Sequence, residues 1–305
     1  MLQKTEKIWF NGHFVPWEEA SVHVLTHTLH YGLGVFEGIR CYKCSDGTSA
    51  VFRLEEHVAR LFDSAQIACL DIPFTRQEIF EAILNTIRVN NLEKGYIRPM
   101  AFLGTGAMGL FPADNPVNLI IAVWPWGAYL GDEALDKGVA VKTSSFTRHQ
   151  VNCMMTKAKI NGNYVNSILA KREALNDGYD EALMLDSEGY CAEATGENIF
   201  CIKNSVLKTP PLDSVLPGIT RDCLMTMARD MDYQVLEQRF TRDELYVADE
   251  AFFCGTAAEL TPIREVDRRT IGAGEAGPVT KLLQQEFFSV VCGDNLKYAG
   301  WLTQI

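Results

Sequence analysis

The sequence has no long apolar stretch: no uninterrupted apolar run in its 305 residues approaches the roughly 18 residues that a membrane-spanning helix needs. Its N-terminal segment, MLQKTEKIWFNG, has neither an apolar core nor a small-residue cleavage site, so we expect no signal peptide. Positive charge is also scarce, because 28 Lys and Arg stand against 39 Asp and Glu and leave a net charge of −11. That balance disfavours a protein that binds nucleic acid or anionic membranes.

The signatures of several enzyme classes are missing as well. No Gly-x-Gly-x-x-Gly opens a helix after a strand, as a dinucleotide-binding fingerprint would. The chain contains neither a Gly-x-x-x-x-Gly-Lys-Ser/Thr phosphate loop nor a Gly-x-Ser-x-Gly nucleophile elbow. The common routes to nucleotide binding and to serine hydrolysis therefore find no support in the sequence.

A metal-binding pattern is incomplete. The nine cysteines are odd in number and scattered, which is typical of reduced thiols and predicts a soluble cytoplasmic protein. Cys41 and Cys44 form one C-x-x-C, and His23, His27 and His30 have the spacing of one helical face. A structural zinc site usually needs four ligands, and neither a second C-x-x-C nor a matched histidine pair is present. We expect no metal here; a thiol or zinc-binding protein built on Cys41 and Cys44 is the alternative of another class.

Length and composition favour a globular protein of two domains. The chain is long for a single hydrophobic core, and 47% hydrophobic with 22% charged residues is ordinary for folded proteins. Strand-like and helix-like segments are mixed without strict alternation, which favours an α+β fold. A Gly-punctuated stretch without periodicity begins at Trp126. We therefore predict domains at residues 1–125 and 139–305, joined by an interdomain loop at 126–138.

Local patterns predict individual elements. Asn11-Gly12 between apolar residues predicts a hairpin over residues 8–15. Apolar residues at helical spacing predict a helix over 54–70, and Thr75 with Glu78 predicts a capping box that opens a second helix. Further strands are predicted at 96–103, 117–124, 139–143, 181–185 and 198–202, and further helices at 163–176, 219–231 and 278–291.

The segment around Lys159 is the most informative for chemistry. It is short, rich in small residues and non-periodic; Gly162 follows, and Tyr164 stands in the first turn of a predicted helix. Such a segment can place an amine and a phenol at the mouth of a site. Taken alone, however, this stretch is better explained as a surface loop, because most lysines are solvated surface charges.

Five segments, taken together, resemble a single family. Lys159 with Gly162-Asn163-Tyr164 resembles the Schiff-base segment of the fold-type IV, or class IV, pyridoxal-phosphate aminotransferases. Residues 56–61, 193–200, 216–221 and 255–259 resemble further motifs of this family and occur in the family's order. Residues 31–40, 96–99 and 126–129 resemble its branched-chain L-amino-acid branch. The resemblance runs from about Ile8 to Trp301, which is nearly the whole chain.

The resemblance implies a fold, a reaction and partners. It implies a small N-terminal α+β domain and a larger C-terminal β-rich domain, with pyridoxal 5'-phosphate bound between them. It also implies transamination between leucine, isoleucine or valine and 2-oxoglutarate, and at least a homodimer, with hexamers among some bacterial relatives. D-amino-acid aminotransferases and aminodeoxychorismate lyases share the cofactor motifs, and they are the alternatives within the same fold.

The resemblance further assigns roles to site residues. Lys159 is the catalytic lysine that holds the cofactor, Glu193 faces the pyridine nitrogen, and Tyr164 donates to the phenolic oxygen. The phosphate cup and the adjoining cofactor contacts are assigned to Arg60, Gly196, Ile219, Thr220 and Thr256. The substrate pocket is assigned to Tyr31, Phe36, Gly38, Tyr96, Arg98, Trp126, Tyr129 and Ala257.

Physical chemistry explains why a pocket of this kind would contain one cation. It must accept an apolar side chain and then the carboxylate of glutamate, which is costly to bury without a partner. An apolar cage with Arg98 at its edge meets both needs, and Tyr96 with backbone groups at Thr256 and Ala257 would bind the α-carboxylate. Three features depart from the family pattern: prolines are absent between Arg148 and Lys159, Asn161 replaces a smaller residue, and Cys254 replaces a frequent serine.

Overall fold

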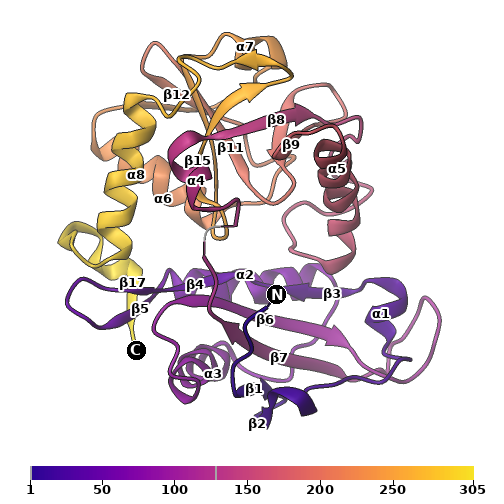
Figure 1. Cartoon of the computed structure of the whole chain (residues 1–305). Coiled ribbons are helices and arrows are strands. Elements are labelled where there is room, and N and C mark those ends of the chain that lie inside the picture. The colour runs from indigo at the N-terminus through magenta and orange to yellow at the C-terminus, as the bar shows by residue number, and fades with distance from the viewer. Residues whose placement is uncertain (1, 128) are drawn as a thin grey trace. The chain divides into compact units, whose positions relative to one another are not determined.

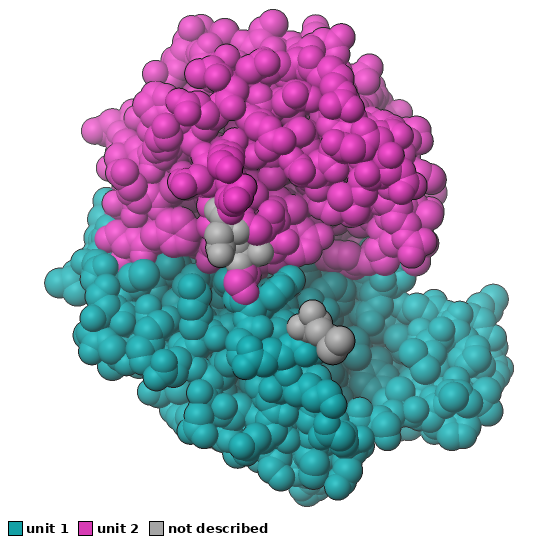
Figure 2. Space-filling model, viewed as in Figure 1, with its two compact units in different colours: residues 1–126, 158–163, 290–305 teal, residues 127–157, 164–289 magenta. Residues whose placement is uncertain are grey.

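A computed structural model describes residues 2–127 and 129–305 of the chain (Figure 1). The chain divides into two compact units (Figure 2). Unit 1 comprises residues 1–126, 158–163 and 290–305, and unit 2 comprises residues 127–157 and 164–289. Each unit contains helices packed with a sheet, and the predicted α+β class is confirmed.

The units differ from the predicted domains at two places. Residues 158–163 were predicted in the C-terminal domain but belong to unit 1, because Val35 and Ile160 form a β-bridge and the Phe36 amide donates to the Lys159 carbonyl oxygen over 3.1 Å. Residues 290–305 also belong to unit 1, since β17 (Leu302–Gln304) pairs with β5 (Ser49–Phe52). The predicted connection at 126–138 includes the short helix α4 (Asp132–Lys137), while its Ala128 lies outside the described residues.

Unit 1 is built on one antiparallel sheet. Within the described residues this sheet has eight strands in the order β17-β5-β4-β6-β7-β1-β2, with β3 paired to β6 (Figure 1). Asn11 and Gly12 have φ of 47° and 95°, as the tight turn of the predicted hairpin requires. The remaining strands are β1 (Lys7–Phe10), β2 (His13–Pro16), β3 (Gly34–Phe36), β4 (Ile39–Lys43), β6 (Gly95–Leu103) and β7 (Val117–Trp124).

Two long helices pack in unit 1. Helix α2 (Leu54–Ile67) contacts β3, α3 (Arg76–Val89) contacts β1 and β7, and the two helices contact each other. The predicted capping box is present, because the Glu78 amide donates to Thr75 Oγ1 over 3.2 Å and the Thr75 amide donates back to Glu78 Oε2 over 2.7 Å. Leu61 and Ile83 are fully buried in the resulting core, where each contributes about 1.5–3 kcal/mol. The short helices are η1 (Trp17–Glu19), α1 (His27–Tyr31), η2 (Asn161–Asn163) and η3 (Leu296–Trp301).

Unit 2 contains a closed ring of strands. The path β10-β9-β8-β15-β14-β11 returns to its start because β10 (Cys191–Ala194) also pairs with β11 (Asn198–Lys203). At this closure Glu193 lies directly opposite Asn198, so the fold itself makes these two residues neighbours. The other strands are β8 (Val139–Thr143), β9 (Glu181–Leu185), β12 (Val206–Thr209), β13 (Gln234–Glu237), β14 (Glu250–Gly255), β15 (Glu259–Val266) and β16 (Arg269–Thr270).

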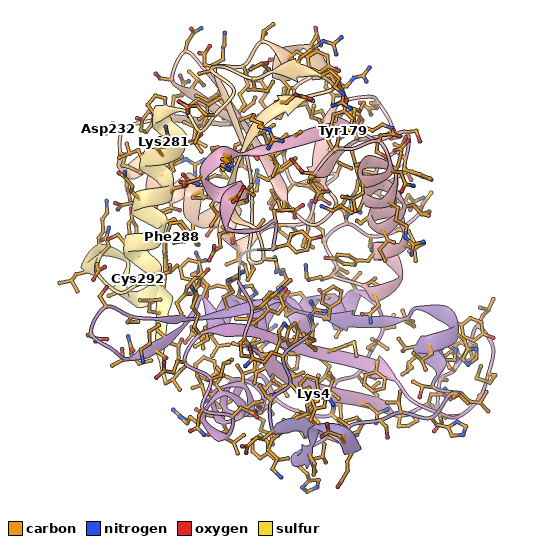
Figure 3. All side chains as sticks on the ribbon, in the orientation of Figure 1. Lys4, Tyr179, Asp232, Lys281, Phe288 and Cys292 are labelled. Carbon is orange, nitrogen blue, oxygen red and sulfur yellow. The ribbon has the colours of Figure 1, made fainter. Side chains whose placement is uncertain are left out.

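Helices of unit 2 pack around this ring. They are α5 (Tyr164–Asn176), α6 (Ile219–Asp230), α7 (Arg242–Tyr246) and α8 (Pro278–Val291), together with α4. Apolar side chains such as Phe253, Leu183 and Val141 fill the core between the strands and are fully buried. Many charged side chains are exposed, among them Lys4 of unit 1 (Figure 3), which forms an ion pair with Glu18. In the described part of the chain, every helix is too short or too polar to cross a bilayer.

Candidate active site

Lys159 is held on both sides of its backbone by unit 1. Its carbonyl oxygen accepts from the Phe36 amide, and its own amide donates to Ser64 Oγ of helix α2 over 3.0 Å. The following residue, Ile160, forms the bridge to Val35. The Lys159 Nζ lies 5.1 Å from the centroid of the Phe36 ring. The stretch that the sequence could describe only as a loop is therefore a fixed edge of the unit 1 sheet, and its amine has a defined place.

Arg98 lies among aromatic rings in the same unit. Its guanidinium carbon is 4.6 Å from the Phe36 ring centroid, 5.4 Å from that of Tyr96 and 5.9 Å from that of Trp124. Tyr96 and Arg98 are two positions apart on β6, so their side chains lie on the same face of the sheet. Trp126 packs edge-on against Tyr96, with 4.7 Å between centroids. The structure thus brings four predicted pocket residues together and adds Trp124, which the sequence reasoning did not single out.

Gly38 has a specific packing role beside this cluster. A Cβ built at position 38 would collide with the hydroxyl oxygen of Tyr96. Glycine is therefore the residue that leaves the Tyr96 phenol in place. Tyr31, by contrast, is 46% exposed at the end of α1, where its ring lies 4.6 Å from that of His27 and 6.2 Å from that of His30.

Arg60, which the resemblance assigned to the phosphate cup, pairs with a buried carboxylate in unit 1. Its Nε donates to Glu37 Oε1 over 2.7 Å and its Nη2 donates to Glu37 Oε2 over 2.9 Å. His57 Nδ1 donates to the same Oε2 over 2.7 Å, since a carboxylate only accepts. Helical spacing showed that Arg60 and His57 share a helix, but their buried partner comes from the loop between β3 and β4. The assignment of Arg60 to a phosphate group stays a prediction, and the sequence reasoning missed Glu37 and His57.

Charge and burial fix the protonation of this trio. Burial alone would raise the pKa of Glu37, but the Arg60 guanidinium and then His57 hold that pKa well below its usual range. Burial lowers the pKa of His57, and this outweighs the opposing effect of Glu37. The positive charges of Arg60 and Lys159 lower it further. At neutral pH the trio therefore consists of a carboxylate, a guanidinium and a neutral imidazole.

The residues weighed for metal binding have other surroundings. Cys41 and Cys44 are buried thiols, and burial raises the pKa of Cys41 to about 12. A ring nitrogen of His27 lies 2.7 Å from the Gly109 carbonyl oxygen, and one of His30 lies 2.9 Å from that of Val24. Across residues 2–127 and 129–305, no three His, Cys, Asp or Glu side chains gather as metal ligands. These contacts favour packed thiols and locally bonded imidazoles.

Glu193 is a buried carboxylate with several partners in unit 2. Its Oε1 lies 2.6 Å from Arg148 Nε. Its Oε2 accepts from the Leu216 amide over 3.1 Å and from Asn198 Nδ2 over 3.3 Å. His149 continues the chain of contacts, with its Nδ1 3.1 Å from Arg148 Nη1; burial and then Arg148 lower the pKa of His149 to about 4. Sequence reasoning found Glu193 but gave no role to Arg148.

The N-terminus of helix α6 lies next to Glu193. Asn198 Nδ2 also donates to the Leu216 carbonyl oxygen over 3.1 Å, two residues before the helix N-cap, Gly218. A Cβ at Gly218 would collide with Asn198 Oδ1, so glycine permits this close approach. Gly218 has no side chain to cap the helix, and the first-turn amides of Ile219 and Thr220 remain for another acceptor. Such a terminus suits a phosphate group.

The remaining predicted site residues of unit 2 include Tyr164, Gly196, Thr256 and Ala257. Tyr164 is the first residue of α5 and is half-buried. Thr256 and Ala257 form the turn between β14 and β15, and the Ala257 carbonyl oxygen accepts from the Tyr129 amide over 3.4 Å. The Gly196 amide donates to Glu197 Oε2 over 3.0 Å.

Glu197 is another buried carboxyl group that the sequence reasoning did not select. Burial, followed by the negative charge of Glu181, raises the pKa of Glu197 well above its usual range. Glu181 is itself fully buried and accepts from Lys171 Nζ over 2.6 Å. Lys171 also lies 5.4 Å from the centroid of the Tyr129 ring, which links this network to a predicted pocket residue.

The departures from the family pattern have structural counterparts. Asn161 Nδ2 lies 3.3 Å from the Met100 sulfur, while its Oδ1 is buried without a hydrogen-bond partner. Cys254 is fully buried on β14, and burial raises the pKa of its thiol. It pairs in register with Asn198, the residue beside Glu193.

Comparison with known proteins agrees with this geometry. A model of the family described as amino-transferase class IV matches residues 34–266. A branched-chain-amino-acid aminotransferase of Pseudomonas aeruginosa is 55% identical over 100% of this chain and 99% of its own length. The Escherichia coli K12 enzyme of the same name is 48% identical over 99% of this chain and 98% of its own.

Solved structures show the same relation. The crystal structure of the Escherichia coli branched-chain amino acid aminotransferase matches with a TM-score of 0.96 and 48% identity, covering 99% of both chains. The corresponding enzyme of Thermobaculum terrenum, solved in its PLP-form, matches with a TM-score of 0.92 and 37% identity over 99% of this chain and 98% of its own. With a family model matching most of its length and relatives this similar over the whole chain, the protein belongs to the class IV aminotransferase family.

Proposed function

We propose that this protein catalyses pyridoxal-phosphate-dependent transamination between branched-chain L-amino acids (leucine, isoleucine and valine) and 2-oxoglutarate, giving branched-chain 2-oxo acids and L-glutamate. The observation that carries the proposal is in unit 2, where Asn198 joins the buried Glu193 carboxylate to the start of α6. A ligand with a basic ring nitrogen and a phosphate group would use both features. The names of the relatives from Pseudomonas aeruginosa and Escherichia coli support the substrate class.

The residues present fit pyridoxal phosphate. Glu193 is a buried carboxylate that would suit a protonated ring nitrogen, and α6 would offer the first-turn amides of Ile219 and Thr220 to a phosphate. Lys159 offers its side-chain amine, and hydrogen bonds with Phe36 and Ser64 fix the backbone of Lys159. When bound, pyridoxal phosphate supplies an electron sink that makes the hydrogen on the substrate Cα acidic.

The chain's own residues then divide the work. Lys159 would hold the cofactor through its amine, and once that amine is free it would take the proton from the substrate Cα. Glu193 would hold a proton at the pyridine nitrogen, where a positive charge favours loss of the Cα proton. Tyr164 would donate to the phenolic oxygen. In unit 2, Thr256 and the first-turn amides of α6 would bind the phosphate, and Gly196 would leave room beside the ring. The resemblance also assigns Arg60 of unit 1 to the phosphate.

Substrate recognition would use an apolar cage with one cation. Phe36, Tyr96 and Trp126 of unit 1 provide apolar and aromatic surface, and the resemblance assigns Tyr129 to the same role. Arg98 pairs with the side-chain carboxylate of glutamate; its buried Nε has no hydrogen-bond partner among the described residues, so a donor awaits an acceptor. Tyr96, whose phenol has room because position 38 is glycine, would bind the α-carboxylate, and the resemblance assigns backbone groups at Thr256 and Ala257 to the same carboxylate.

We further propose that the protein is cytoplasmic and forms at least a homodimer. Leu110 and Phe111 of unit 1 are 90% and 89% exposed, and large exposed apolar side chains that lie together mark interaction surfaces. Tyr31, half-exposed on the same unit, would then serve the pocket of the neighbouring subunit. Light scattering at several concentrations distinguishes a monomer from a dimer or a hexamer.

The activity is tested by product analysis. The purified protein, supplied with pyridoxal phosphate, L-leucine and 2-oxoglutarate, should form L-glutamate and 4-methyl-2-oxopentanoate in equal amounts, and D-leucine should give neither product. Turnover of D-alanine alone would move the protein to the D-amino-acid aminotransferases. Release of pyruvate and 4-aminobenzoate from aminodeoxychorismate would move it to the lyases.

A further inference from the structure

Arg98 has no counter-ion among residues 2–127 and 129–305. No carboxylate in the described part of the chain forms an ion pair with it, and its Nε is buried without a hydrogen-bond partner. Its guanidinium instead lies over the rings of Phe36, Tyr96 and Trp124, at 4.6, 5.4 and 5.9 Å from their centroids. These three rings, here called the Arg98 cage, are the groups that stabilise its charge.

Trp124 is the member of the Arg98 cage that was not predicted as a pocket residue. Trp124 lies on β7 directly opposite Tyr96 of β6. Arg98 lies opposite Ala122, two residues before Trp124, so Trp124 and Arg98 are diagonal neighbours across the two strands. Its ring is 5.2 Å from that of Tyr96 and 6.2 Å from that of Trp126, so the aromatic cluster fixes its orientation. Tryptophan also has the strongest attraction for a cation among the aromatic side chains.

The energetic value of the cage depends on what fills the pocket. When the substrate side chain is apolar, as in leucine, it offers Arg98 no charge, and the rings remain the partners of the guanidinium. When the side chain carries a carboxylate, as in glutamate, an ion pair with Arg98 supplies most of that stabilisation. Weakening the cage should therefore penalise the complex with the apolar ligand more than the complex with the dicarboxylate.

We propose that Trp124 is a specificity-determining residue: by stabilising Arg98 when an apolar side chain fills the pocket, it shifts the balance of binding toward branched-chain over dicarboxylate ligands. The inference rests on the proposed function and on the assignment of Arg98 to the glutamate side chain. Trp124 of β7 is a positioning residue in this proposal, because it acts through its contact with Arg98.

The test measures binding of two unreactive ligands, 4-methylvalerate and glutarate, to the cofactor-loaded protein by calorimetry. Trp124→Leu removes the ring, and Trp124→Phe keeps a ring with a weaker attraction. The ratio of the 4-methylvalerate Kd to the glutarate Kd should rise about 2- to 30-fold in Trp124→Leu. Trp124→Phe should change the ratio in the same direction by a smaller factor. The KM ratio of L-leucine to L-glutamate should follow, with kcat changing less.

A matched control comes from the same unit. Trp301 forms the same kind of pair with Arg53, whose guanidinium carbon is 5.2 Å from the ring centroid. Trp301→Leu should lower the melting temperature and leave the ratio of the two Kd values unchanged. A shift of that ratio in Trp301→Leu equal to the one in Trp124→Leu would overturn the inference.

A double-mutant cycle separates the inference from the proposed function. In an Arg98→Met background, glutarate should bind more weakly, and Trp124→Leu should no longer change the ratio. An unchanged ratio in both Trp124 variants of the Arg98 protein would overturn the role of Trp124 alone. So would a shift that persists without Arg98, because Trp124 would then act through pocket shape. If Arg98→Met does not weaken glutarate binding, the assignment of Arg98 itself fails.

Discussion

Replacing Glu37 by glutamine should destabilise unit 1 strongly. The Glu37 carboxylate is fully buried and accepts three hydrogen bonds, two from Arg60 and one from His57. Glutamine keeps the shape and can reform part of the hydrogen bonding, but it removes the negative charge that compensates the guanidinium of Arg60, a residue only 9% exposed. Removal of one partner from a buried pair costs about 3–5 kcal/mol, a large part of the roughly 5–15 kcal/mol by which proteins are stable.

Urea unfolding of Glu37→Gln measures this loss at pH 7.5. The matched control is Glu18→Gln in the same unit, because Glu18 pairs with Lys4 and the two side chains are 69% and 63% exposed. An exposed pair contributes about 1 kcal/mol or less, so the control should unfold almost as the parent protein does. A loss in Glu37→Gln no larger than the loss in Glu18→Gln would refute the role assigned to the buried trio.

The acid side of the stability curve gives an independent check. Because the pKa of Glu37 is depressed, its contribution is present above the unfolded value near 4.5 and is lost as pH falls below it. The pKa of His57 is also depressed in the native state. As pH falls below 6.5, His57 therefore binds a proton in the unfolded state before it does in the native state, and the protein loses stability. The difference in stability between the parent protein and Glu37→Gln should therefore shrink as pH falls below 4.5. A difference that stays constant down to pH 3 would contradict the role of the Glu37 charge.

Three other substitutions test separate parts of the site. Gly38→Ala should displace the Tyr96 phenol and raise KM for both substrates at least several-fold, measured by steady-state kinetics; an unchanged KM would show that Tyr96 does not bind substrate. Arg148→Met leaves Glu193 buried without its cation, so it should lower the free energy of unfolding in urea by about 3–5 kcal/mol and also lower kcat. Arg148→Lys should recover part of both losses. An Arg148→Met variant with unchanged stability and kcat would show that Arg148 does not support Glu193. Lys159→Arg keeps the charge but has no amine that can bond the cofactor aldehyde, so it should abolish turnover; measurable activity near the parent level would exclude Lys159 as the catalytic lysine.

Local sequence patterns were sufficient for most long elements. The Asn11-Gly12 hairpin, the capping box at Thr75 and the helices and long strands with clear periodicity all lie where they were predicted, within a few residues. Short strands such as β10, β12 and β13 were not predicted, because four residues are too few for an alternating pattern. β10 closes the ring with β11, while β12 pairs with β11 and β13 with β12 outside the ring, so all three depend on partners that are distant in the sequence.

The same limit separates the predicted site residues from the missed ones. Lys159 and Glu193 stand in local segments that resemble family motifs and could be selected from them. Glu37 and Arg60 are 23 residues apart, and their pairing becomes visible only when α2 packs beside β3. A charged residue between Phe36 and Gly38, both of them predicted site residues, was the available signal for Glu37. Trp124 gave no such signal, because it became a neighbour of Arg98 only through the register of β6 and β7.

We expect Lys159 to hold pyridoxal phosphate for reaction with branched-chain L-amino acids. The most direct measurement is the visible absorption spectrum of the purified, cofactor-loaded protein before and after addition of L-leucine, with D-alanine added to a parallel sample. The protein should be yellow, with a visible absorption band that disappears with L-leucine, returns with 2-oxoglutarate and does not respond to D-alanine. A protein that stays colourless after incubation with pyridoxal phosphate, or a band that responds only to D-alanine, would contradict this expectation.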